Sequence, residues 1–174
     1  KTCVGTDHCR FGTQDSTGLG IKLEQALWGS WTPHKVKLGV SGCPRNCAEA
    51  TCKDIGVICV DSGYEIHFAG AAGLDIKGTE LLCHVKTDAE VKEHGVALAQ
   101  MYREQERIYK WAKRVGLDEI RDQIMQQPDK RKGYYDRFVF SQKFAQVDPW
   151  SERVSGKDKH EFNPMATLSL EAAE

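Results

Sequence analysis

The spacing of apolar residues changes about halfway along the chain, from short strand-like runs to helical spacing. In the first half, residues 35–40 show the apolar and polar alternation of a half-buried strand. Two further runs are joined by Asp61-Ser62-Gly63, a connection typical of a hairpin. The pattern therefore predicts strands at residues 35–40, 55–60 and 64–69, and another apolar segment at residues 81–85.

Two short helices are predicted in the same half. Residues 15–18 are typical of a helix start, and Gly29 is a suitable stop. Pro44 suits the first turn of a helix that would carry residues 47–50. The first helix is indicated by the apolar residues Ile21, Leu23, Ala26, Leu27 and Trp28.

The second half has the spacing of helices. Thr87 and Glu90 match a capping box, and Gly116 is a plausible stop for the helix that follows. A second short helix is predicted from Asp118 to the residue before Pro128, and a third at residues 131–146. One apolar stripe at helical spacing, which predicts a packing face, consists of Val91, Gly95, Leu98, Tyr102, Tyr109 and Ala112.

The order of these elements predicts an α+β fold, with a mixed, partly antiparallel sheet, packed helices and a helical C-terminal extension. We expect residues 1–86 to form an α/β module that carries the chemistry and residues 87–146 to form the helical extension. Residues 147–174 are polar and are expected to be a flexible tail.

Composition and charge exclude several classes of protein. The chain has 174 residues, of which 40% are hydrophobic and 28% charged, as in a soluble globular protein. A formal net charge of −1 gives no bulk attraction to nucleic acid or to an anionic membrane. The apolar runs are too short to span a bilayer, and no signal peptide is visible. We therefore expect neither nucleic acid nor a membrane as a partner.

Cysteine is the residue type that suggests a chemistry. The chain has seven cysteines, an odd number that fits a metal or cluster site in a reducing cytoplasm better than a disulfide scaffold. Cys59 and Cys83 lie in apolar runs and are expected to be core residues, whereas Cys52 has no clear role. The remaining four form two pairs, Cys3 with Cys9 and Cys43 with Cys47.

The pairs have the spacing C-x5-C, then 33 residues, then C-x3-C. Four thiolates on two tight loops suit a 4Fe–4S cluster, because each iron takes one protein sulfur. Gly5, Gly12 and Gly42 allow the backbone to approach closely, so that N–H groups can donate to sulfur. A structural zinc site and four unrelated thiols are the alternatives, although zinc knuckles favour C-x2-C.

Because Cys3 lies so close to the start and no Met precedes it, we expect the chain to be a fragment that lacks its N-terminal partner segment. Two motifs, T-C-V-G-T-D-H-C-R-F-G and S-G-C-P-R-N-C-A-E-A, make the chain resemble the sirohaem-containing nitrite and sulfite reductases. The resemblance is closer to the large subunit of the assimilatory NAD(P)H nitrite reductases. It extends from residue 1 to about residue 127, through residues 53–57, 70–73 and 114–118.

This resemblance implies a function and cofactors. In the family, cysteines in the positions of Cys3, Cys9, Cys43 and Cys47 hold a 4Fe–4S cluster, and the one corresponding to Cys47 also bridges to the sirohaem iron. The implied reaction is the six-electron reduction of nitrite to ammonia, with FAD and NAD(P)H bound by segments outside this chain. The implied partners are the missing N-terminal half and a small nitrite reductase subunit.

The resemblance implies no catalytic residue in this chain, because the substrate-side Arg and Lys residues of the family lie upstream. We therefore expect the isolated chain to be inactive. Arg10 and Arg45, which flank the cysteines, and Asn46 are candidates for contacts to the cofactors. Two alternatives stay open, namely part of a sulfite reductase haemoprotein and a non-catalytic, zinc-stabilised binding module.

Overall fold

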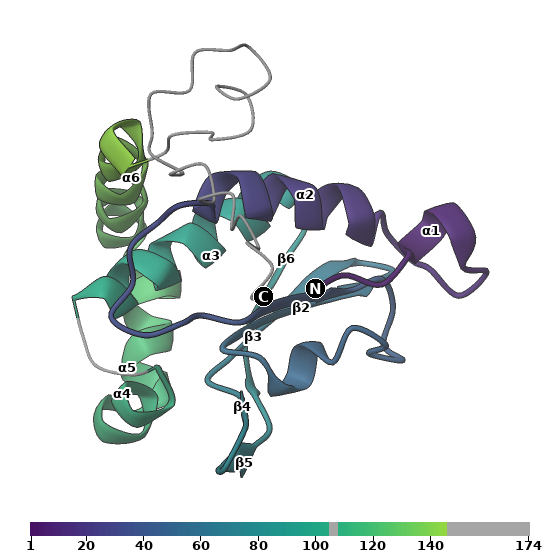
Figure 1. The fold of residues 1–174 in the computed structure, drawn as a ribbon, viewed down its shortest axis with the longest axis horizontal. Helices are drawn as coiled ribbons and strands as arrows, with labels where there is room; N and C mark the ends of the chain where they lie inside the picture. Colours follow the sequence, from purple (N-terminus) through teal and green to yellow (C-terminus); the bar gives the residue numbers. More distant parts are fainter. Residues whose placement is uncertain (105–107, 146–174) are drawn as a thin grey trace, which may run out of the picture.

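A four-stranded sheet with two long helices on one of its faces forms the centre of the fold (Figure 1). The computed structural model describes residues 1–104 and 108–145. The first two strands in the sheet order are parallel and the other pairs are antiparallel, which confirms the predicted α+β fold with a mixed sheet. In sheet order, the strands are β1 (Leu38–Ser41), β2 (Ile55–Val60), β3 (Gly63–Phe68) and β6 (Glu80–Val85).

The hairpin of β2 and β3 matches the prediction, but β1 is displaced toward its C-terminal end. β1 was expected at residues 35–40. The N–H of Lys37 instead donates to the carboxylate of Asp54 at 2.8 Å, so pairing along the strand starts at Leu38. The displacement carries β1 as far as Ser41, directly before the second pair of cysteines.

A small hairpin extends beyond the end of the sheet (Figure 1). It consists of β4 (Ala71–Ala72) and β5 (Ile76–Lys77), in a segment for which no strand was predicted. Leu74 and Ile76 are exposed in this hairpin. The hydroxyl of Tyr109 donates to Asp75 at 3.1 Å, which links the hairpin to a helix.

The helix before β1 is present as predicted. The helix α2 (Ser16–Leu27) is capped by Asp15, whose carboxylate accepts a hydrogen bond from the N–H of Gly18 at 2.7 Å. It buries Leu19 and Leu23. Ile21 is 53% exposed, because it lies on the other side of the helix.

The long helix predicted after Thr87 is divided into two. The predicted capping box is present at the start of α3 (Asp88–Arg103), but this helix ends at Arg103 and α4 (Ile108–Val115) is a separate element. The expectation of one continuous helix is therefore wrong, although the stripe residues Val91, Leu98, Tyr102 and Ala112 are buried, as expected of a packing face. In α4, Ile108, Trp111 and Ala112 are buried. The ring of Trp111 meets that of Phe68 edge-on with centroids 5.9 Å apart.

Three further helical elements follow within residues 108–145, the second described range. Gly116, with φ of +89°, ends α4 as predicted. Pro128 begins the last helix, three residues earlier than expected, since proline suits a first helical turn. The elements are α5 (Leu117–Arg121), the π-helical segment η2 (Asp122–Gln126) and α6 (Pro128–Ala145).

The main core joins both halves of the chain. It contains Ile55 and Phe68 of the sheet, Leu23 of α2, Leu98 of α3 and Ile120 of α5. The division of the chain into two modules at residue 86 stays a prediction. The predicted tail at residues 147–174 lies outside the described residues.

A second cluster packs α6 against α3 through Phe138, Val96 and Ala99. In the described ranges, no helix has both the length and the apolar character that crossing a membrane requires.

Candidate cofactor site

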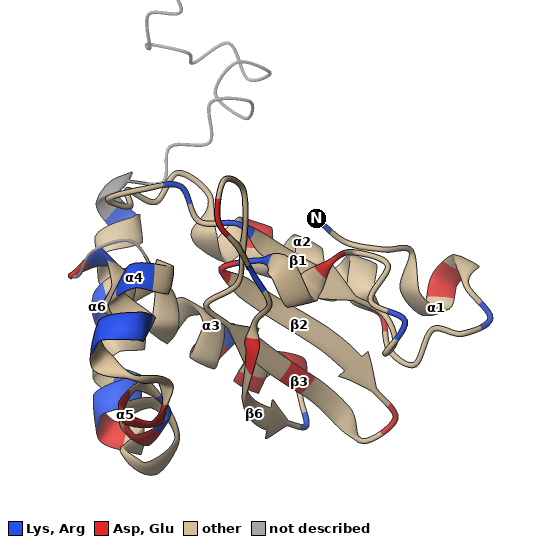
Figure 2. Cartoon of the chain, turned by 90° about the horizontal axis from the view of Figure 1, so that it is seen from below, with Lys and Arg blue, Asp and Glu red and all other residues tan. Residues whose placement is uncertain are grey.

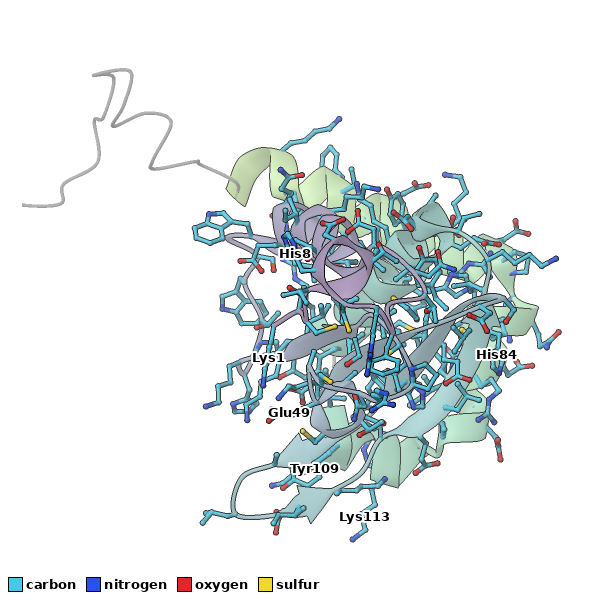
Figure 3. The ribbon with its side chains drawn as sticks, turned by 90° about the vertical axis from the view of Figure 1, so that its right-hand side faces the viewer. Lys1, His8, Glu49, His84, Tyr109 and Lys113 are labelled. Carbon is cyan, nitrogen blue, oxygen red and sulfur yellow. The ribbon has the colours of Figure 1, made fainter. Side chains whose placement is uncertain are left out.

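The two cysteine segments meet at the C-terminal end of β1. Thr2 forms a parallel bridge with Val40, and the N–H of Cys3 donates to the carbonyl of Val40 at 3.2 Å. Lys1 and Glu49, labelled in Figure 3, form an ion pair at 2.9 Å, so the start of the chain also contacts the second cysteine segment. The short helix α1 (Gly5–His8) lies between Cys3 and Cys9 in the sequence. Figure 3 views the molecule from the end at which α1 lies.

Cys3 lies between the two loops. The N–H of Gly42 donates to the sulfur of Cys3 at 2.9 Å, and the hydroxyl oxygen of Ser16 lies 3.5 Å from the same sulfur. Burial by itself raises the pKa of the Cys3 thiol, but several hydrogen bonds, of which that from the N–H of Gly42 contributes most, outweigh it, so this pKa is lowered. The thiolate, which is the form that binds iron or zinc, is therefore favoured at Cys3.

Glycine is required at close backbone contacts both within the first loop and between the two loops. A Cβ at Gly12 would lie 2.5 Å from the carbonyl carbon of Gly5 and 2.5 Å from the nitrogen of Thr6. A Cβ at Gly42 would lie 2.7 Å from the Cα of Gly5. The N–H of Thr13 also donates to the carbonyl of Gly42 at 2.7 Å, so the two loops interlock through backbone contacts.

The second loop contains turns where a short helix was predicted at residues 47–50. Asn46 and Glu49 both have φ of +58°, in the left-handed region, and only a short 3₁₀ segment, η1 (Ala50–Cys52), follows. The side-chain oxygen of Asn46 accepts hydrogen bonds from the hydroxyl of Ser41 at 3.1 Å and from the N–H of Ala50 at 2.7 Å. These bonds compete with a helix and hold the loop in its turns.

The amide nitrogen of Asn46 donates to Thr51 at 2.6 Å, so its side chain is engaged within the loop. Replacing Asn46 with Ala is expected to lower the free energy of unfolding more than replacing it with Gly. Both changes remove the side-chain bonds, but only glycine adopts the positive φ without strain. Denaturant unfolding of both variants measures the difference; equal losses would show that the backbone conformation of Asn46 contributes nothing.

The seven cysteines are free thiols in different surroundings. Cys43 is buried, Cys3 and Cys9 are partly exposed, and Cys47 is exposed. Burial raises the pKa of Cys59 to about 12 and that of Cys83 to about 11, so both stay protonated at neutral pH.

Cys59 and Cys83 are buried, as expected of core residues. The thiol of Cys52 donates to the carbonyl of Glu49 at 3.2 Å.

The four predicted ligands are not gathered around one point. Among residues 1–104 and 108–145, no three His, Cys, Asp or Glu side chains are arranged to hold a single metal ion. The ligands of a 4Fe–4S cluster surround a cube of atoms, with one sulfur at each iron, so they do not need to converge on a point. Two interlocked loops that favour the Cys3 thiolate and present a backbone N–H to its sulfur suit such a group.

Phe11, which lies in the first motif but was not a candidate site residue, connects the two candidate arginines. The guanidinium carbon of Arg45 lies 3.9 Å from the centroid of the Phe11 ring, and that of Arg10 lies 4.7 Å from it. In the sequence, Phe11 could have been found as an aromatic residue that directly follows Arg10 in a loop bounded by glycines. Figure 2 shows isolated basic positions in the loops near α1, whereas more basic positions lie along α4 and α6.

Comparison with known proteins assigns the chain to a family. The family model of the nitrite and sulphite reductase 4Fe-4S domain matches residues 1–132. A nitrite reductase [NAD(P)H] of Bacillus subtilis is 43% identical over 175 residues, which is 97% of this chain and 22% of that protein. The chain thus spans about a fifth of the length of this relative.

Two sulfite reductases are also similar. An assimilatory-type sulfite reductase of Nitratidesulfovibrio vulgaris is 31% identical, covering 72% of this chain and 59% of that protein. The crystal structure of dissimilatory sulfite reductase I shares the fold, with a TM-score of 0.59 at 16% identity over 68% of this chain and 50% of that one. By its match over residues 1–132, the chain belongs to the nitrite and sulphite reductase 4Fe-4S domain family.

Proposed function

We propose that the chain is the iron–sulfur and sirohaem portion of an NAD(P)H-dependent nitrite reductase, which reduces nitrite to ammonia. Family membership supports a cluster, and 43% identity to the Bacillus subtilis nitrite reductase supports the substrate. The structural observation that carries the proposal is the hydrogen bond from Gly42 to the sulfur of Cys3, which joins the two cysteine loops.

In this proposal Cys3, Cys9, Cys43 and Cys47 are the ligands of a 4Fe–4S cluster. Cys47 is exposed, so its sulfur is accessible to a second group and would be shared with the sirohaem iron. When bound, the cluster and sirohaem supply the one-electron transfers that protein side chains do not provide. The chain itself holds the ligand loops in register, lowers the pKa of the Cys3 thiol and provides the cations of Arg10 and Arg45.

The rest of the enzyme lies on other segments of the complete protein. We propose that these segments bind FAD and NAD(P)H and provide the upstream half of the nitrite site, so this chain alone does not turn over. Residues 1–86 would be the cofactor-binding module and residues 87–146 the helical extension. A small subunit is a further proposed partner, and the cytoplasm is the proposed location, since thiols persist there.

Nitrite turnover by the complete protein tests the function. With NAD(P)H as donor, we expect nitrite to be converted to ammonia, and we expect this chain alone to convert none. Ammonia formation that survives complete removal of iron would contradict the proposal.

Sulfite reduction is the second candidate function. It is favoured by the 31% identity to the sulfite reductase of Nitratidesulfovibrio vulgaris, of which the chain covers 59%. The same assay separates the two functions, because sulfite would yield sulfide. Sulfide formation that is faster than ammonia formation would favour the second function.

A further inference from the structure

Two arginines share one phenyl ring beside the cysteines. The guanidinium carbons of Arg45 and Arg10 lie 3.9 Å and 4.7 Å from the centroid of Phe11. Arg10 directly follows Cys9 in the first loop, whereas Arg45 belongs to the second loop. Because both guanidinium carbons are measured from the same ring centroid, the distance between them is at most the sum of these two distances. Phe11 therefore links the two cysteine loops and holds one cation from each of them at its ring.

Neither arginine pairs with a carboxylate in the part of the chain that the structure describes. Arg121, Arg131 and Arg137, in contrast, each form an ion pair with Asp or Glu. Two like charges held near each other repel, and an anionic ligand that pairs with both of them would relieve that repulsion. A guanidinium also offers the paired donors that suit a carboxylate.

Phe11 has no role in either hydrophobic core. It is 40% exposed and belongs to neither of the two core clusters. Its ring contacts the two guanidinium groups instead, and such contacts hold a cation over an aromatic face. The Phe11 ring at this exposed position therefore holds the guanidinium groups of Arg10 and Arg45 in place.

We propose that Phe11 is a positioning residue that holds Arg10 and Arg45 as a binding site for a ligand with several carboxylates. The identification of this ligand as sirohaem rests on the proposed function. The placement of the two arginines at the Phe11 ring does not depend on that function. The site orients the anionic edge of the ligand with respect to both cysteine loops. Phe11 acts through the arginines and does not touch the reacting atoms.

The chain without cofactors allows a test that does not depend on the cluster. Citrate serves as a tricarboxylate probe, and NMR signals of the arginine Nε–H groups report its binding. We expect saturable shifts at Arg10 and Arg45. Phe11→Leu should weaken citrate binding by about five-fold or more, because both cation–π contacts are lost, whereas Phe11→Tyr keeps an aromatic face and should restore it.

Tyr134→Leu is the matched control. It removes the ring over which Arg137 lies at 4.7 Å, at a site remote from the cysteine sequence motifs, and should leave citrate binding unchanged. If Phe11→Leu does not fold, Arg45→Gln provides the test, because it removes one cation and keeps the ring. This variant must then show the weaker citrate binding. Unchanged citrate affinity in a folded Phe11→Leu or Arg45→Gln variant, or equal shifts at all arginines, would overturn the inference.

The outcomes for this site and for the proposed function are separable. Citrate binding that depends on Phe11, in a complete protein that holds neither iron nor sulfide, would support this inference and refute the cluster. A complete protein that assembles the cluster, together with a cofactor-free chain whose citrate binding is indifferent to Phe11, would support the function and overturn this inference.

Discussion

Replacing Cys43 with serine is expected to remove most of the iron and acid-labile sulfide from the complete protein. Cys43 is buried and directly follows Gly42 at the start of the second cysteine loop, and serine does not replace a thiolate as a ligand of iron. Loss of a group that merely orients a ligand typically lowers metal affinity about 10–100-fold, so loss of the ligand itself should cost more. Iron and sulfide analysis after anaerobic purification measures the effect.

Cys52→Ser is the matched control for this change. Cys52 lies only five residues after Cys47, but its thiol donates to the carbonyl of Glu49 and is not a proposed ligand. We expect this variant to keep its full iron and sulfide content. The ligand assignment fails if Cys52→Ser loses the metal while Cys43→Ser retains it.

Replacing Gly12 with alanine is expected to destabilise the fold and the site together. The new Cβ would lie 2.5 Å from two backbone atoms, the carbonyl carbon of Gly5 and the nitrogen of Thr6. Backbone cannot rotate away as a side chain does, so the two segments must separate. Overpacking of this kind typically costs about 1–3 kcal/mol, and we expect the upper part of that range. Denaturant unfolding gives the loss in the free energy of unfolding.

Gly73→Ala tests whether the effect belongs to Gly12 or to glycine in general. A Cβ at Gly73 meets nothing within 4 Å, and the backbone there has no positive φ. We expect this variant to be as stable as the original chain or slightly more so, because alanine restricts the unfolded state. Equal losses in the two variants would show that the contact of Gly12 with Gly5 is not what constrains the loop.

The sequence predicted the sheet well where two independent signals agreed. The apolar runs of β2 and β3 and the turn residues between them both indicate a hairpin. The break between α3 and α4 was not predictable from the spacing of apolar residues. Tyr109 and Ala112 continue the helical spacing of α3, although α3 ends at Arg103 and α4, which begins at Ile108, is a separate helix. Periodicity records which face is apolar and does not record whether the helix is continuous.

The cysteine loops show the same limit. Pro44 favours a helix locally, but the bonds of Asn46 to Ser41 and Ala50 produce turns instead. The contact of Phe11 with Arg45 joins residues far apart in the sequence, so no local pattern announces it. The identity of the four candidate ligands needed only their spacing, whereas the surroundings that favour the Cys3 thiolate required the fold.

The central claim is that the four cysteines hold an iron–sulfur cluster. The most direct test is iron, zinc and acid-labile sulfide analysis of the complete protein, purified without oxygen, together with its absorption spectrum. The account predicts about four iron and about four sulfide per chain from this site, with little zinc, and an additional haem band. Zinc without acid-labile sulfide would contradict the account and would favour a zinc-stabilised structural module.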